Sequence, residues 1–198
     1  MKAYHELPEG YTKTRSIDLQ KDKKTMLLVN GIALAIMILM VAVMGFFVPI
    51  LSMVDLDNGD RGLVDTLIRL AVMFIGCIVY IVLHELVHAA VMKAVGCKKV
   101  RFGFTGIYAY AGSPGEYFDR SAYICVSLAP LVVFGLIFLV LQFVVPRTWF
   151  WVVWVLQISN VSGAAGDIYV SILTARSPKT ILAEDTGVGM AFFDRTLE

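Results

Sequence analysis

Four long apolar stretches alternate with short polar segments along the 198-residue chain. They cover residues 26–51, 67–95, 121–145 and 149–175. A helix crosses a hydrocarbon core of about 30 Å with about 20 apolar residues, and each stretch is long enough to do so. The pattern therefore predicts an all-α integral membrane protein with four transmembrane helices.

The polar segments divide the chain further. Residues 1–25 read as an N-terminal arm, residues 26–176 as one four-span membrane domain, and residues 177–198 as a C-terminal tail. Between the second and third stretches, residues 100–110 roughly alternate apolar with polar or small side chains, and Gly103 and Gly106 mark turns. This alternation predicts a short β-hairpin-like loop at the membrane surface.

Composition and charge support a membrane location. The chain is 58% hydrophobic and 17% charged, whereas soluble domains carry about 25% charged residues. Lysine and arginine gather before the first stretch and around the 96–120 loop, so the positive-inside rule predicts that this loop and both termini are cytoplasmic. We expect a multi-pass protein of the plasma membrane, whose partners are the bilayer and a membrane-protein or peptide substrate, with no nucleic acid.

Within five residues, the second stretch places three titratable groups, His84, Glu85 and His88. A charged group near the bilayer centre costs about 2.5–3.5 kcal/mol, so such residues indicate function. The two histidines are one helical turn apart and leave the same face, and Glu85 is rotated by about 100° from His84. This is the HExxH pattern, in which the histidines bind zinc and the glutamate is the general base. The alternative is a pair of histidines that only form hydrogen bonds across the bundle.

Catalytic zinc usually has three protein ligands, so two histidines require a partner. Asp167 is the acid within the fourth stretch, and it lies nine residues before the next cation, as His84 does. If both helices run in the same direction, the two residues lie at about the same depth. The small residues before Asp167 allow close helix contact or a local break. A pairing of Asp167 with another polar group stays open, and Glu116 and Asp119 are weaker candidates for the third ligand.

Three features resemble the site-2 protease type of intramembrane zinc metalloproteases. They are the sequence HELVH at residues 84–88, the sequence SLAPLVV at residues 127–133, and Asn160 seven residues before Asp167. The chain is most similar to a compact bacterial family of zincin-type membrane peptidases. The resemblance implies that Asp167 is the third zinc ligand and that Asn160 is a polar group near the substrate. Asp167 is flanked by Gly166 and Ile168 here, where the site-2 pattern has leucine and glycine.

The residues predict a zinc-dependent intramembrane endopeptidase with its site toward the cytoplasm. Zn²⁺ would be held by His84, His88 and Asp167, and Glu85 would be the general base. Asn160 is a candidate for oxyanion or substrate binding, and the predicted hairpin, with Phe102 and Phe104, is a candidate for holding an unwound substrate strand. The alternatives are a non-catalytic zinc-binding scaffold or an accessory or immunity factor, and then a transporter.

Overall fold

The computed structural model describes residues 1–18, 21–55, 58–106 and 109–195. It is a mixed structure, 63% helical and 17% strand. The helices are α1 (Lys23–Phe47), α2 (Gly59–Ala94), α3 (Arg120–Val144), α4 (Phe150–Gly163) and α5 (Ala165–Arg176), with short 3-10 turns η1 (Ile50–Met53) and η2 (Arg147–Trp149). The strands are β1 (Ala3–Tyr4), β2 (Tyr11–Asp18), β3 (Arg101–Phe104), β4 (Ala109–Gly112), β5 (Tyr117–Asp119), β6 (Leu182–Asp185) and β7 (Gly189–Arg195).

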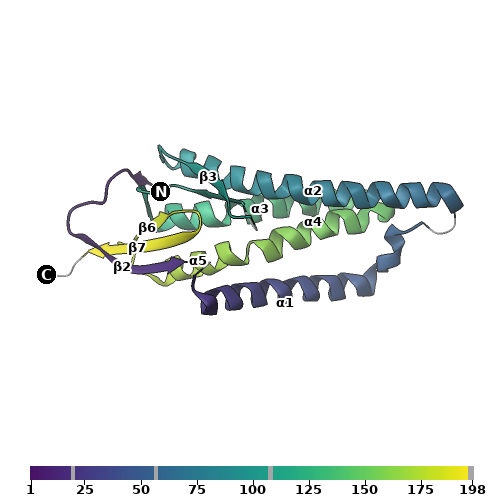
Figure 1. Ribbon diagram of the computed structural model, residues 1–198, viewed down its shortest axis with the longest axis horizontal. Helices are drawn as coiled ribbons and strands as arrows, with labels where there is room; N and C mark the ends of the chain where they lie inside the picture. The colour runs from purple at the N-terminus through teal and green to yellow at the C-terminus, as the bar shows by residue number, and fades with distance from the viewer. Residues whose placement is uncertain (19–20, 56–57, 107–108, 196–198) are drawn as a thin grey trace.

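The helices form an elongated bundle with the strands at one end (Figure 1). α4 contacts each of the three long helices, α1, α2 and α3. Large apolar side chains on the long helices, such as Leu39, Phe74 and Phe143, face outward and are exposed. An apolar surface this extensive suits lipid, in which helices satisfy their own backbone hydrogen bonds. The three long helices are thus compatible with membrane insertion.

The prediction of an all-α protein with four transmembrane helices is wrong. Among the described residues, three helices are long and apolar enough to cross a membrane. The fourth predicted stretch folds as two helices, α4 with 14 residues and α5 with 12. The break lies at Ala164, between Gly163 and Gly166. Each glycine destabilises a helix interior by about 1 kcal/mol relative to alanine. The small residues before Asp167 therefore mark a local break, one of the two readings that the sequence allowed.

A five-stranded antiparallel sheet is the second departure from the all-α prediction. Its strand order is β1-β5-β6-β7-β2, so the N-terminal arm and the C-terminal tail fold together. β2 pairs with β7 along residues 11–18 and 189–195, from opposite ends of the chain. Short strands whose partners are this distant carry little local pattern, because pairing depends on neighbours that the sequence does not place together.

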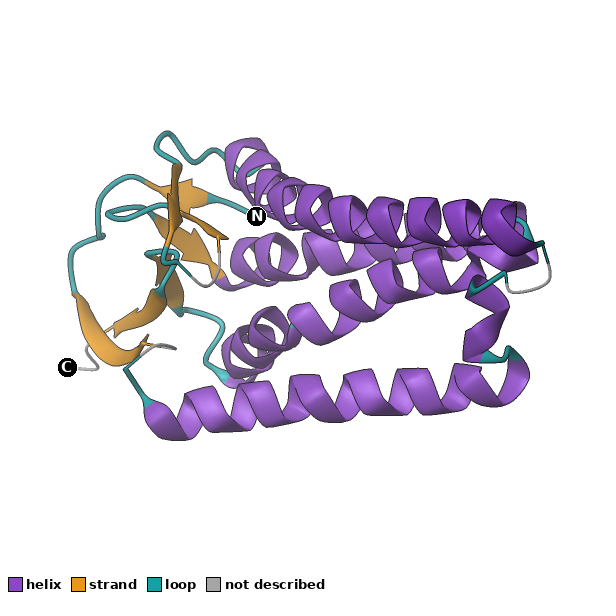
Figure 2. Ribbon diagram, turned by 45° about the vertical axis from the view of Figure 1, so that its right-hand side comes forward, coloured by secondary structure: helices purple, strands orange, loops and turns teal. Residues whose placement is uncertain are grey.

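The sheet packs against the ends of α2, α3 and α5 (Figure 2). Phe118 from β5 and Phe192 from β7 meet Met92, Tyr123 and Val126 from the helices in one buried cluster. Burial of one such phenylalanine contributes about 1.5–3 kcal/mol. The sheet is therefore anchored to the same end of the bundle that carries the HExxH residues.

The predicted hairpin is present as β3 paired with β4, although its tip, residues 107–108, lies outside the described residues. The ring of Tyr110 lies between Gly103 and Gly187, where any side chain would collide with it. Gly187 also has a φ of 86°, which favours glycine. The backbone of Gly112 touches the same turn between β6 and β7. The C-terminal strands thus fix the position of β4.

A buried carboxylate holds the connection between α2 and β3. Glu116 accepts hydrogen bonds from the backbone N–H groups of Lys98 (2.9 Å) and Lys99 (2.8 Å), and its Oε2 lies 3.2 Å from Nδ1 of His5. Burial raises the pKa of the Glu116 carboxyl, but these hydrogen bonds outweigh burial and hold the pKa below its usual value. The ionised form is therefore the one that stabilises the fold.

Replacing Glu116 with glutamine should lower the stability of the protein at pH 7 by about 1–3 kcal/mol. Because the pKa is lower in the folded than in the unfolded state, the carboxylate stabilises above its unfolded value of 4.5, and this contribution is lost as pH falls through the folded pKa. Thermal unfolding in detergent should show a deficit for Glu116→Gln at pH 7 that shrinks below about pH 4. The exposed Glu9→Gln is the control, and an equal deficit at both pH values would contradict this assignment.

Candidate metal centre

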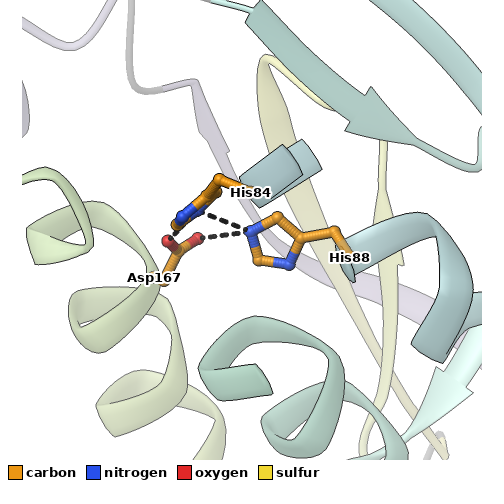
Figure 3. A group of neighbouring side chains, drawn as sticks. All are labelled: His84, His88 and Asp167. Atoms are coloured by element: carbon orange, nitrogen blue, oxygen red, sulfur yellow. Dashed lines mark hydrogen bonds and ion pairs between the residues drawn. The ribbon is translucent and has the colours of Figure 1, made fainter. Parts of the chain in front are cut away.

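Three side chains from two helices converge on one point. His84 and His88 lie one turn apart toward the end of α2, and Asp167 lies in the first turn of α5 (Figure 3). The Nε2 atom of His84 is 3.3 Å from Oδ2 of Asp167, and that of His88 is 3.6 Å from Oδ1. The two Nε2 atoms are 3.1 Å apart. Both histidines are buried, and Asp167 is partly exposed.

The outer nitrogens of both histidines have hydrogen-bond partners. Nδ1 of His88 lies 2.9 Å from the carbonyl oxygen of Val126, which can only accept, so this nitrogen carries the hydrogen. Nδ1 of His84 lies 2.9 Å from the hydroxyl of Tyr80, which donates its hydrogen to Asn160 and so accepts from His84. Metal binding requires neutral imidazoles, each with one N–H; with that hydrogen on Nδ1, both Nε2 atoms direct lone pairs at Asp167.

This donor set fits zinc. Two lone pairs 3.1 Å apart beside a carboxylate repel one another unless a cation lies between them. Zinc binds imidazole and carboxylate at about 2.0–2.2 Å, and in a tetrahedron the ligand atoms are then about 3.3–3.6 Å apart. The separations of 3.1, 3.3 and 3.6 Å bracket that value. Two nitrogens and one carboxylate also match a catalytic site, which keeps a fourth position open.

Glu85 lies beside this cluster and does not belong to it. Its Oε2 accepts a 2.6 Å hydrogen bond from the backbone N–H of Ala111 in β4, so the hairpin fixes the direction of the carboxylate. Glu85 follows His84 on α2, and both line one cavity. A carboxylate next to the metal ligands, held by a single N–H, can accept a proton from water.

The cluster opens into a cavity of about 880 Å³. Its wall combines residues of all five helices, the hairpin and the turn between β6 and β7. Asp185 of β6 lies in this wall, where it accepts hydrogen bonds from the hydroxyl of Tyr123 (3.2 Å) and the N–H of Gly187 (2.7 Å). Burial raises the pKa of Asp185 to about 6, against the opposing effect of the Gly187 hydrogen bond. The cavity thus contains a third acid besides Glu85 and Asp167, and this one belongs to the sheet.

The weaker site predictions have separate outcomes. Asn160 is fully buried behind Tyr80, and its Nδ2 donates to the carbonyl of Leu131 at 3.1 Å, so both ends of its amide are in use. Phe104 lines the main cavity. Phe102 lines a smaller apolar pocket of about 260 Å³ on the other side of Glu85. Substrate contact by these three residues stays a prediction, and the surroundings of Asn160 favour a supporting role.

Sequence reasoning missed Tyr80 and the N–H of Ala111. Tyr80 could have been found, because it lies four residues before His84 and therefore on the same helical face. The N–H of Ala111 is a backbone group that any residue except proline supplies, so no side chain indicates it.

If Asp167 is the third ligand, Asp167→Asn should bind zinc at least 10-fold more weakly than the wild type, since even changes outside the ligand set cost 10- to 100-fold. The measurement is metal content by mass spectrometry and the zinc Kd by competition with a chelator. Asp185→Asn is the matched control, because it removes a partly buried carboxylate of the same cavity outside the cluster. Unchanged affinity in Asp167→Asn would place the third ligand elsewhere.

Comparisons with known proteins agree with the chemistry of this centre. Residues 77–182, more than half of the chain, match a family model described as "Putative zincin peptidase". The matched segment contains the two histidines, Glu85 and Asp167. No curated protein and no solved structure matches the chain. The chain belongs to this family of zincin peptidases, which implies a metallopeptidase with zinc as its cofactor.

Proposed function

We propose that this protein is a zinc-dependent intramembrane endopeptidase. It hydrolyses a peptide bond in a membrane-associated protein or peptide, near the cytoplasmic side of the membrane. The observation that carries the proposal is Glu85, a carboxylate that shares a cavity with His84, His88 and Asp167. A zinc site that only stabilises a scaffold has no use for an acid beside its ligands, whereas hydrolysis requires a base there.

The mechanism assigns a separate task to each residue. His84, His88 and Asp167 would hold zinc, whose Lewis acidity polarises a peptide carbonyl and acidifies water. The Glu85 carboxylate takes a proton from the attacking water as the new C–O bond forms. It then gives that proton to the amine nitrogen as the C–N bond breaks, so one water is consumed for each bond cleaved. The N–H of Ala111 keeps Glu85 oriented for both transfers.

The membrane location rests on α1, α2 and α3 together with the distribution of charge. Basic residues concentrate at the end of the bundle that carries the sheet, which supports a cytoplasmic sheet and cytoplasmic termini in the plasma membrane. His84 lies ten residues before the end of α2, or about 15 Å along the helix. The site would then be recessed from the cytoplasmic surface, where water can enter through the cavity.

A substrate would bind in an extended form. A peptide bond within a regular helix is shielded by its own side chains, so cleavage requires local unwinding. β4 pairs with β3 on one side, and its Ala111 N–H points away from β3 toward Glu85. A strand edge beside the proposed base offers backbone hydrogen bonds to an unwound segment.

Glu85→Gln should abolish cleavage while zinc binding persists, because glutamine cannot accept the proton. Membranes from cells that produce the wild type or Glu85→Gln would be compared by mass spectrometry of new protein N-termini. We expect a set of N-termini that depends on wild-type protein and is absent from the variant. Glu9→Gln, which alters an exposed carboxylate outside the cavity, is the control. The proposal fails if Glu85→Gln and the wild type generate the same N-termini.

Phe104 and Phe102 provide a matched pair for substrate binding. Phe104 lines the main cavity, so Phe104→Ala should reduce kcat/KM about 10-fold, as expected for the loss of one buried aromatic contact. Phe102 lines the smaller pocket, so Phe102→Ala should change kcat/KM less. Both side chains are exposed, and neither change should unfold the protein. Equal effects of the two variants on a substrate identified by the N-terminal comparison would contradict a substrate path along the main cavity.

A further inference from the structure

The Nδ1 atoms of both histidines have hydrogen-bond partners on the side away from Asp167. These partners matter because a neutral histidine binds a metal through Nε2 only when its one hydrogen is on Nδ1. Free neutral imidazole exchanges between the two tautomers. A partner that accepts from Nδ1 holds the hydrogen there and fixes the orientation of the ring. The source of each partner therefore bears on how well the site is organised before a metal arrives.

The partner of His88 exists because of a proline. In a helix, the carbonyl of residue 126 normally accepts from the N–H of residue 130. Residue 130 is Pro130, in the interior of α3, and it has no N–H. The carbonyl of Val126 is thus left without that bond, and Nδ1 of His88 lies 2.9 Å from it. Pro130 and Val126 are both fully buried, so the carbonyl is shielded from solvent.

The partner of His84 is the end of a directed chain of hydrogen bonds. The carbonyl of Leu131 can only accept, so the atom of Asn160 that faces it at 3.1 Å must be Nδ2. Oδ1 of Asn160 then faces Tyr80 and accepts its hydroxyl hydrogen at 3.1 Å. The hydroxyl oxygen is left to accept from Nδ1 of His84 at 2.9 Å. Each direction follows from the one before it.

Packing holds this chain of hydrogen bonds in place. The ring of Tyr80 makes edge contacts with Phe134 and lies against Phe138, both of which are buried. Asn160 has no exposed surface, and its amide lies close to Gly135. This chain of hydrogen bonds therefore joins α2, α3 and α4, and its side chains have little freedom to rotate.

We infer that Pro130, Tyr80 and Asn160 are positioning residues that hold both histidines in the Nδ1–H tautomer and thereby set the affinity of the site for zinc. Pro130 acts on His88 by freeing a backbone acceptor, and Asn160 acts on His84 through Tyr80. None of the three touches the metal position. The inference rests on the proposed zinc ligands, and its test does not require a cleavage assay.

The first measurement is the zinc Kd of purified full-length variants, by competition with a chelator. Tyr80→Phe, Asn160→Leu and Pro130→Ala should each weaken binding about 10- to 100-fold. Tyr80→Phe retains the packed ring, and Pro130→Ala restores an N–H that competes with His88 for the carbonyl of Val126. Tyr80 and Asn160 act through one chain of hydrogen bonds. The double variant Tyr80→Phe/Asn160→Leu should therefore bind zinc no more weakly than the single variant with the lower affinity.

The control is Thr174→Val. Thr174 is fully buried and donates its hydroxyl to the carbonyl of Val170, so the change removes a buried hydroxyl that has no link to either histidine. Zinc affinity should stay at the wild-type value in this variant. Equal weakening in Thr174→Val and Tyr80→Phe would mean that general loss of stability explains both, and it would overturn the inference.

The second measurement reads the tautomers directly in the metal-free protein, by nitrogen NMR of ¹⁵N-labelled histidine. The chain has three histidines, so His5→Gln identifies the signals of His5 by difference, His84→Gln identifies those of His84, and the remaining set belongs to His88. At a pH high enough that both imidazoles are neutral, wild type should show the Nδ1–H form for His84 and His88. Tyr80→Phe and Asn160→Leu should mix the tautomers of His84 alone, and Pro130→Ala those of His88 alone.

The outcomes separate this inference from the proposed function. The positioning roles are overturned if Tyr80→Phe and Pro130→Ala bind zinc as tightly as the wild type. They are also overturned if the Nδ1–H form persists in these variants. A protein that binds zinc, loses affinity in these variants and cleaves nothing would support the inference and refute the peptidase. A wild type that binds no zinc refutes the proposed function and, with it, the effect on zinc affinity.

Discussion

The contact between the histidines of α2 and Asp167 of α5 is the interaction on which the rest of the structure depends. Polar groups inside an apolar bundle are costly unless each has a partner. Here the partners come from different elements: a carboxylate from α5, a carbonyl from α3, and the Tyr80 hydroxyl backed by Asn160 of α4. A shift of any helix by one turn would leave at least one of these groups unpaired. Because unpaired polar groups are costly in the apolar interior, the polar cluster favours this register of the bundle.

The division of the fourth apolar stretch follows the same requirement. Asn160 and Asp167 are seven residues apart, about two helical turns, and serve opposite nitrogens of His84. Asn160 acts on Nδ1 through Tyr80, and Asp167 faces Nε2. The break at Ala164 lies between them, so α4 and α5 adopt separate directions. Asn160 can then be buried while Asp167 reaches the cavity. In one straight helix, by contrast, the positions of the two residues relative to each other would be fixed.

The sequence predicted the parts of this protein that repeat along a helix. Three apolar spans, the His84 and His88 pair and the depth of Asp167 all follow from a regular rise and rotation per residue. The sheet was missed because β2 and β7 belong to opposite ends of the chain and gain stability only when paired. A resemblance predicted Asn160 as a polar group near the substrate. Its burial behind Tyr80 was missed, because the spacing of Asn160 along the sequence does not indicate it. Pro130 did leave a signal in the sequence, because a proline in a helix frees the carbonyl four residues before it. Which donor then reaches that carbonyl depends on how α2 packs on α3.

The strands reach the chemistry through the backbone. The turn between β6 and β7 packs Gly187 on the ring of Tyr110 and touches Gly112. Ala111 lies between these two residues of β4, and its N–H donates to Glu85. A carboxylate on an apolar helix would otherwise be free to rotate, and one N–H at 2.6 Å gives it a direction. The orientation of Glu85 on α2 therefore depends on strands from the last 17 residues of the chain, which the helical pattern of the sequence left without a role.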